Sequence, residues 1–310
     1  MSTISCPTQA IAVATIGDVP GVVPLAAELV GDVVQRSPGA VRARVLIARR
    51  RHGLAPKPSP SAHDSTALHD PAGREWIDFE AVVGTDADQI AVAPGVLRET
   101  WTENGRRYFR YAPDAPVKNA FAIFSAAYAV HEAEWTAPGT EPAPGLNGGR
   151  VVRIEIFHHP RHAYNLDRMV RSVKATLDYG TRHFGPYPHR QLRIVEFPRY
   201  GNFAHAYPGT ISYAEGFGFL TRVDEGGETF DAPFTVVAHE VAHQWWAYQV
   251  VPAAVEGFAL LSEVLAQYTA LMVLEATYGP EPVRRFLGQM QIEYLNRRSG
   301  SDDPLLRAGH

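Results

Sequence analysis

The chain changes its hydrophobic pattern at a segment rich in proline and glycine, TAPGTEPAPGLNGG, which spans residues 136–149. Ahead of it, VLRETWTENGRRYFRYAP predicts two strands joined at Asn104-Gly105, because this dipeptide favours a two-residue hairpin turn. The segment AFAIFSAAYAVHEAEW alternates in polarity and predicts a further strand. This part of the chain is therefore predicted to be all-β, and the Pro/Gly-rich connector is the predicted domain boundary.

Beyond the connector, the pattern predicts both strands and helices. VVRIEIFHH and QLRIVEF predict strands, GTISYAE predicts a strand at a sheet edge, and residues 165–184 have helical spacing. A helix is expected to begin near Asp231, because aspartate caps helices and Pro233 suits the first turn. A second helix is expected from about residue 256 to residue 278, where Gly279-Pro280 stops it.

The predicted fold class is α+β, with three segments along the chain. Residues 1–75 form an N-terminal segment whose structure the pattern does not specify; it contains a candidate helix at residues 22–34 and a Pro/Ser-rich linker at residues 57–70. Residues 76–149 form a partial β-sandwich domain, and residues 150–310 form the second domain.

Composition excludes several classes of protein. A formal charge of -4 over 310 residues gives no reason to expect a nucleic-acid partner. The single cysteine, Cys6, excludes an intramolecular disulfide and suits a reducing compartment. No run of eighteen apolar residues could span a membrane, and the N-terminus lacks the basic start of a secretory signal. We expect a soluble, cytoplasmic chain.

The segment VVAHEVAHQWWAYQV contains the pattern H-E-x-x-H. His239 and His243 are four residues apart, so on a helix they lie on one face and can bind one metal ion. Glu240 is turned away by about 100° and can reach a water on that ion without ligating it, as a general base must. Two packed or surface histidines are the simpler interpretation, but the apolar neighbours and a third ligand favour a zinc hydrolase site.

Two glutamates are candidates for the third ligand. Glu256 follows His243 after only twelve residues, too few for one helix to end and another to return, and it suits the first turn of a helix. Glu263 follows after nineteen residues, which allows a loop at residues 250–255 and an antiparallel helix that holds the carboxylate rigidly. We therefore assign Glu263 as the third zinc ligand.

HEVAHQWW followed by SEVLAQYTA resembles the aminopeptidase N-type gluzincins, in which HExxHQWF precedes NEGFAxY. FPRYGNFAHAYPGTISYAE, residues 197–215, is especially similar to the peptidase-like domain of bacterial membrane permease-like proteins. The resemblance covers residues 76–310 and implies a β domain followed by a thermolysin-like zinc metallopeptidase domain. It also implies that Phe203 and Tyr207 border the substrate cleft, and it matches Tyr268 with the tyrosine five residues after the ligand glutamate.

The chain departs from that family in two respects. Where the family's GxMEN stretch supplies a glutamate that holds the substrate's amino group, this chain has Ala206 and Tyr207. Glu215 is either a substitute for that glutamate or a surface acid at a strand end. The family also places an oxyanion-stabilising tyrosine in a later YxxxG-like segment, and no tyrosine here matches it, so we expect the metallopeptidase domain to be C-terminally truncated.

Two further groups of side chains have more than one interpretation. His158, His159 and His162 follow a predicted strand, where a solvated turn is favoured over a metal site. Trp245 and Trp246 either line a substrate pocket or pack behind the metal-binding helix, and packing is favoured for at least one of them.

The sequence favours a zinc metallopeptidase that binds one Zn²⁺ through His239, His243 and Glu263. Zinc would acidify a bound water, and Glu240 would take the proton and pass it to the leaving amine of a peptide substrate. The alternative is a weakened or inactive peptidase-like domain that serves as a structural or binding module beside a membrane permease-like partner. Retention of Glu240 favours the enzyme, because a structural zinc site needs four protein ligands and no general base.

Overall fold

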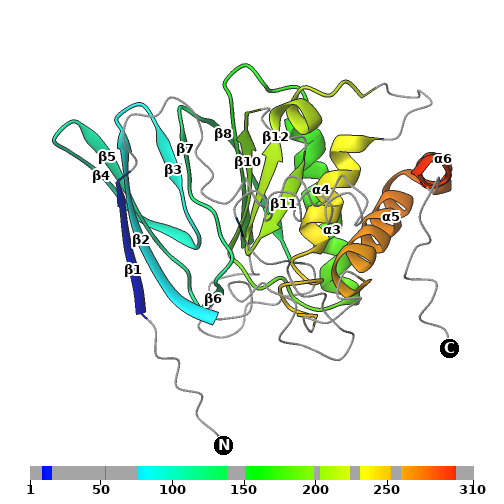
Figure 1. Cartoon of the computed structure of the whole chain (residues 1–310), viewed down its shortest axis with the longest axis horizontal. Coiled ribbons are helices and arrows are strands. Elements are labelled where there is room, and N and C mark those ends of the chain that lie inside the picture. Colours follow the sequence, from blue (N-terminus) through cyan, green and yellow to red (C-terminus); the bar gives the residue numbers. More distant parts are fainter. Residues whose placement is uncertain are drawn as a thin grey trace, which may run out of the picture.

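The computed structural model describes residues 9–15, 53, 76–137, 151–198, 203–223, 231–252 and 260–297. The candidate helix at residues 22–34, the linker, most of the Pro/Gly-rich connector and Glu256 lie outside these residues. The described chain has the predicted α+β fold. Figure 1 shows a strand-rich part at one side, a second sheet in the middle and the helices at the other side.

The strand-rich part is built from two small sheets. The larger has the order β1-β2-β5-β4, with β6 paired to β2, and the smaller pairs β3 with β7. Its strands are β1 (Gln9–Thr15), β2 (Trp76–Asp86), β3 (Ile90–Val92), β4 (Val96–Glu103), β5 (Arg106–Ala112), β6 (Val117–Lys118) and β7 (Phe124–Ala126). Asn104 and Gly105, with φ of 51° and 75°, form the turn between β4 and β5, which confirms the predicted hairpin.

The second sheet has the order β11-β12-β10-β9-β8. Its strands are β8 (Ala129–Thr136), β9 (Val151–His158), β10 (Gln191–Phe197), β11 (Ala204–Tyr207) and β12 (Thr210–Ala214). The three inner strands, β9, β10 and β12, run parallel, and β10 is buried along its whole length because both faces of the sheet are covered. The prediction that GTISYAE forms an edge strand is wrong, since β11 pairs with β12 and takes the edge.

The segment predicted as one strand ahead of the connector forms two strands in different sheets. β7 pairs with β3, whereas β8 pairs with β9 from Ala129 opposite His158 to Thr136 opposite Val151. A bend between the two strands lets the chain leave one sheet and enter the next. The second sheet therefore begins with β8, ahead of the Pro/Gly-rich connector, so the change from one sheet to the next does not coincide with that connector. The domain boundary at the connector stays a prediction.

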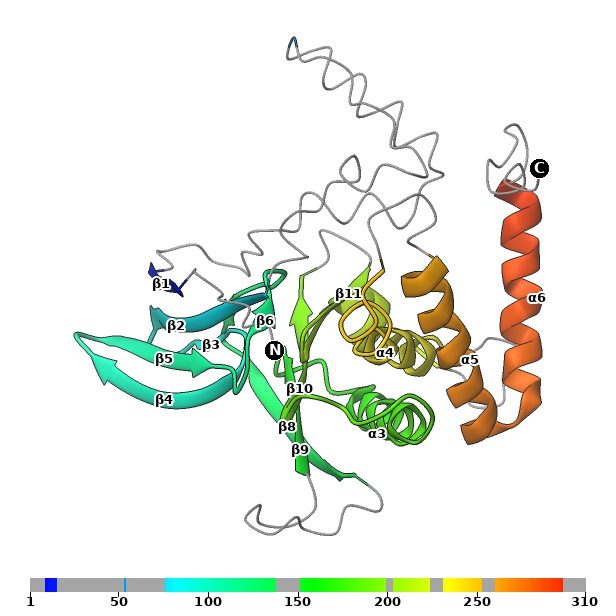
Figure 2. The same cartoon turned by 90° about the horizontal axis from the view of Figure 1, so that it is seen from below.

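Two helices cover one face of the second sheet, and the last two helices lie beyond them (Figures 1 and 2). The helical elements are α3 (Leu166–His183), the π-helical turn η1 (Glu215–Phe219), α4 (Ala232–Ala242), the π-helical turn η2 (Leu260–Val264), α5 (Leu265–Tyr278) and α6 (Pro280–Arg297). Met169 and Val173 of α3 and Val241 of α4 are buried against strand residues such as Ile154. On the opposite face of the sheet, the strand-rich part contributes buried side chains, so the second sheet is the middle layer of the molecule.

The helical part differs from prediction in two places. α4 ends at Ala242 with His243 as its C-cap, several residues before the predicted loop. Gly279, at a φ of 82°, ends α5 as predicted, but Pro280 then begins α6, which sequence analysis did not anticipate. No helix in the described ranges is both long enough and apolar enough to cross a bilayer.

Candidate metal centre

Helix α4 is held in place at its start and along both sides. The Asp231 side chain accepts a hydrogen bond from the backbone N–H of Phe234 at 3.0 Å, which caps the helix as predicted. Phe234 and Ala238 pack toward α5, and Val237 and Val241 pack in the cluster that α3 and the sheet share. A helix buried on two sides has a fixed rotation, so the direction of its remaining side chains is set by packing.

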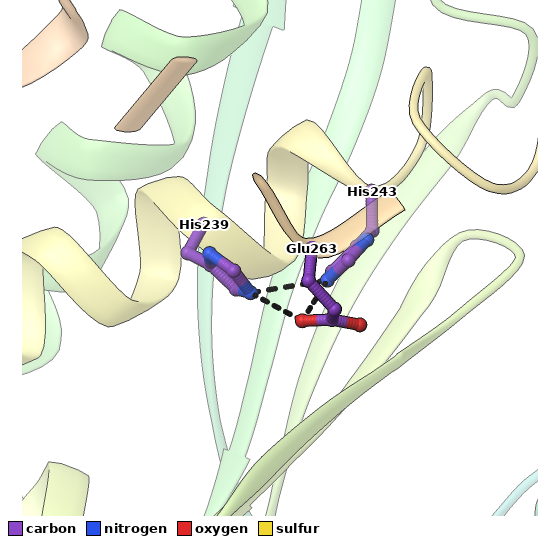
Figure 3. Close-up of side chains that lie close together, drawn as sticks. All are labelled: His239, His243 and Glu263. Carbon is purple, nitrogen blue, oxygen red and sulfur yellow. Dashed lines mark hydrogen bonds and ion pairs between the residues drawn. The ribbon is translucent and has the colours of Figure 1, made fainter. Parts of the chain in front are cut away.

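Figure 3 shows that His239 of α4 and His243, the C-cap of that helix, point toward the Glu263 carboxylate, which comes from η2. The two histidine Nε2 atoms are 3.1 Å apart. Oε2 of Glu263 lies 3.4 Å from Nε2 of His239 and 3.6 Å from Nε2 of His243. The structure therefore brings together the three residues predicted as zinc ligands.

The spacing of the three ligand atoms fits a zinc ion. Tetrahedral zinc with ligands at 2.0–2.1 Å requires ligand atoms about 3.3 Å from one another. The observed separations of 3.1, 3.4 and 3.6 Å bracket that value. Two imidazoles and one carboxylate are also the donor set of zinc hydrolases, which keep the fourth position for water or substrate.

A hydrogen bond behind the site orients His243. Its Nδ1 lies 2.9 Å from the carbonyl oxygen of Trp246. Because a carbonyl can only accept, Nδ1 carries the proton and Nε2 is left to act as a ligand. Nδ1 of His239 is buried and has no hydrogen-bond partner within the described residues.

The charges at the site favour a cation between the three side chains. Burial alone would lower the pKa of His243, but the hydrogen bond to Glu263 and the charges of Glu240 and Glu263 raise it to about 9. Burial alone would raise the pKa of Glu263, yet hydrogen bonds from His239 and His243 hold it well below its usual range. A carboxylate that stays ionised beside two imidazoles attracts a proton or a metal ion to the same place.

Glu240 lies close to the three ligands without being one of them. Its side chain is buried, at 7% relative exposure. Its charge acts on His243, and it is also felt by Tyr207 and Tyr213 on the neighbouring strands. The charge of Glu240 therefore acts both on a predicted ligand, His243, and on strands β11 and β12.

Of the three predicted substrate-binding residues, Tyr207 lies nearest to Glu240. Burial, followed by the charge of Glu240, raises the pKa of Tyr207 to about 12, so the hydroxyl stays a donor at neutral pH. Phe203 and Tyr207 both pack against the cluster on the other face of the sheet, where the rings of Phe203 and Phe197 have centroids 4.9 Å apart. Tyr268 lies on α5 with 57% of its surface exposed. Their roles in substrate binding stay predictions.

The two tryptophans support the end of α4 by packing. Trp245 is 2% exposed and lies against Gly180 of α3, where an added Cβ would approach the indole to 2.5 Å. The Trp246 indole N–H donates to the Thr269 hydroxyl of α5 at 2.9 Å. The favoured interpretation, packing behind the metal-binding helix, is confirmed for Trp245.

Sequence analysis overlooked Gln244, which is fully buried. Its Oε1 accepts from the backbone N–H of Gly209 at 2.8 Å, and its Nε2 donates to the carbonyl of Tyr207 at 3.0 Å. One side chain thereby ties the end of α4 to the turn between β11 and β12. The sequence signal that could have revealed this role is a glutamine among apolar residues directly after H-E-x-x-H, because a buried amide needs hydrogen-bond partners.

The three histidines at the end of β9 differ in their surroundings. His158 is 5% exposed, and His162 Nδ1 donates to the carboxylate of Glu196, whereas His159 is exposed. Glu215, considered above as an amine anchor or a surface acid, lies with His162 and Glu196, all three offering ligand atoms within 4.8 Å of one another. The solvated-turn prediction is therefore wrong for His158 and His162.

Comparison with known proteins supports the fold. No protein-family profile and no curated protein sequence matches the chain. Its structure resembles aminopeptidase A of Legionella pneumophila in complex with aspartic acid, with a TM-score of 0.56, 18% identity and coverage of 67% of this chain and 24% of that one. It also resembles a two-domain M1 zinc metallopeptidase variant bound to L-tryptophan, with a TM-score of 0.52, 17% identity and coverage of 73% and 46%.

A further structure of that two-domain variant, bound to L-arginine, matches with a TM-score of 0.52, 17% identity and coverage of 77% of this chain and 49% of that one. The chain thus spans between a quarter and a half of the length of these proteins. The described structure has the fold of M1 zinc metallopeptidases, as the gluzincin resemblance predicted. The relation to permease-like proteins and the predicted truncation stay predictions.

Proposed function

We propose that the chain is a zinc-dependent metallopeptidase domain that hydrolyses peptide bonds. The observation that supports this most directly is the convergence of His239, His243 and Glu263 at separations of 3.1–3.6 Å, with Glu240 buried beside them. A structural site would use four protein ligands, and it would not place a buried carboxylate next to the open position.

Each side chain of the site has its own role in the proposed reaction. His239, His243 and Glu263 hold the ion, which when bound polarises a substrate carbonyl and lowers the pKa of water. Glu240 accepts the proton of the attacking water and delivers it to the amine nitrogen as the peptide bond breaks, so the proton is conserved. Tyr207, whose hydroxyl stays protonated, supplies a hydrogen-bond donor on the facing strand.

A second candidate function has one observation in its favour. Ala206 stands where the resemblance predicts the amine-binding glutamate; its side chain is 3% exposed and its carbonyl accepts from Tyr248 at 2.6 Å. Glu215, the candidate substitute, belongs to a different cluster. A chain without this anchor loses its preference for a free amino terminus, and it then acts on internal bonds or binds peptides without turnover.

Zinc content and cleavage, measured on the same samples, test the proposal. Wild type should bind zinc with His239, His243 and Glu263, and Glu263→Gln should lower the affinity of that site by about 100-fold or more. An aminoacyl-arylamide and a longer internally quenched peptide, each with and without an acetylated amino terminus, report cleavage. Cleavage of the acetylated peptide would indicate an endopeptidase.

Glu134→Gln is the matched control, because Glu134 is an exposed glutamate on β8. It should leave both zinc binding and cleavage unchanged. Zinc bound at this site without cleavage of any substrate would support the peptide-binding alternative. If wild type and Glu263→Gln bind zinc equally, the assigned ligand set is wrong.

A further inference from the structure

A second group of metal-ligating side chains lies at the carboxyl ends of the parallel strands. His162 follows β9, Glu196 is the penultimate residue of β10, and Glu215 directly follows β12. Because β9, β10 and β12 are parallel neighbours, their carboxyl ends meet at one edge of the sheet. In open sheets of this kind, ligands bind at that edge.

Hydrogen bonds fix the central carboxylate of this group. Glu196 is 4% exposed; its Oε2 accepts from the backbone N–H of His159 at 2.6 Å, and its Oε1 accepts from Nδ1 of His162. The His159 and His162 rings pack with centroids 4.5 Å apart. His162, Glu196 and Glu215 each offer one ligand atom, and these three atoms lie within 4.8 Å of one another.

The charges at this edge favour a bound cation. Glu196 is almost fully buried, and Glu215 places a second carboxylate beside it. Two carboxylates near each other, one of them almost fully buried, repel unless a positive charge lies between them.

We propose that His162, Glu196 and Glu215 form a second site for a divalent metal ion, separate from the His239–His243–Glu263 centre. Imidazole suits Zn²⁺, and carboxylates suit harder ions such as Mn²⁺, so a set of one nitrogen and two oxygens suits either. The ion would join the ends of three strands. This inference does not rest on the proposed peptidase activity, because the site shares no ligand with the first.

Metal stoichiometry of the full chain, with Zn²⁺ and with Mn²⁺ as probes, tests this inference. Elemental analysis after gel filtration, and titration by calorimetry and Mn²⁺ electron paramagnetic resonance, give the number of ions bound. Wild type should bind two ions. His162→Gln and Glu196→Gln should each bind one, and Glu263→Gln should retain the ion that His162→Gln loses.

His159→Gln is the matched control, because His159 contacts Glu196 through its backbone N–H, which the substitution keeps. It should bind two ions. Glu215→Gln changes a partly exposed position and replaces Glu196→Gln as the test if that variant fails to fold. It should lower the affinity for the second ion by about 10-fold or more. The inference would be overturned if wild type bound a single ion that Glu263→Gln loses and His162→Gln keeps. It would also be overturned if His162→Gln and Glu215→Gln each bound two ions.

Discussion

The two histidine–glutamate clusters of this molecule are built in opposite ways. In the first, two ligands come from one helix and are four residues apart, and Glu263 is 56% exposed on its side chain. In the second, each residue lies at the carboxyl end of a different strand, and the central Glu196 is 4% exposed. The first cluster is exposed to solvent at Glu263, whereas the second is centred on a carboxylate buried within the sheet.

This difference separates two kinds of chemistry. An open site with a nearby general base suits hydrolysis, because reactants must enter and leave. A site centred on a buried carboxylate at the ends of three strands suits binding that stabilises the fold, because an ion that binds only the native state adds to the free energy of unfolding. We expect substitutions at the first cluster to change cleavage, and substitutions at the second to change metal-dependent stability.

The largest expected effect is that of Glu240→Gln on cleavage. The substitution keeps the shape of the side chain but removes its ability to accept a proton, so kcat should fall by about 10²–10⁴-fold. Zinc content should stay unchanged, because Glu240 is not a ligand. Steady-state kinetics and metal analysis on one preparation check both points. Equal kcat in Glu240→Gln and wild type would contradict the assignment of hydrolysis to the first cluster.

Two glycines allow each cluster to be disturbed separately. Gly180→Ala places a Cβ 2.5 Å from the Trp245 ring, behind the first cluster, and Gly218→Ala places one 2.6 Å from the Tyr213 ring, near Glu215. Each overpacked side chain should lower the free energy of unfolding by about 1–3 kcal/mol. Gly180→Ala should weaken mainly the first metal site, and Gly218→Ala mainly the second.

Gly288→Ala is the control for these substitutions. Its added Cβ has no neighbour within 4 Å, and alanine favours helices over glycine, so it should stabilise α6 by about 0.5–1 kcal/mol. Denaturant unfolding and calorimetric metal titration of the three variants give the required values. Equal loss at both metal sites in both destabilised variants would show that the clusters are energetically coupled.

The smallest expected effect is the pH dependence that Glu196 of the second cluster contributes. The pKa of Glu196 is raised above its unfolded value of about 4.3, so between these two pKa values the native state binds more protons than the unfolded state. In metal-free protein, the contribution of Glu196 to the free energy of unfolding should therefore increase as pH falls from neutral toward about 4.5. It should decrease again as pH rises.

This dependence is best measured in a His162→Gln background, which removes the titration of the partner imidazole. The Tm of this variant, minus that of the double variant with Glu196→Gln, should increase between pH 7.5 and about pH 4.5. A difference that decreases over this range would contradict the raised pKa.

Sequence analysis predicted the elements whose signals are local. The Asn104-Gly105 turn, the cap at Asp231 and the stop at Gly279 were all recognised, because each depends on the backbone preference of one or two residues. It failed for AFAIFSAAYAVHEAEW, since alternation shows that a segment is extended but not which sheet it joins. The start of α6 at Pro280 was missed because the same dipeptide ends one helix and begins another.

The two clusters show the same limit at the level of function. Spacing along one helix was enough to pair His239 with His243, because i and i+4 residues share a face wherever that helix lies. The partnership of His162, Glu196 and Glu215 arises only when β9, β10 and β12 align in parallel, which joins three residues spread over more than fifty positions. Helix geometry repeats within a few residues and is written into local sequence, whereas the order of strands in a sheet is set by the packing of the whole chain.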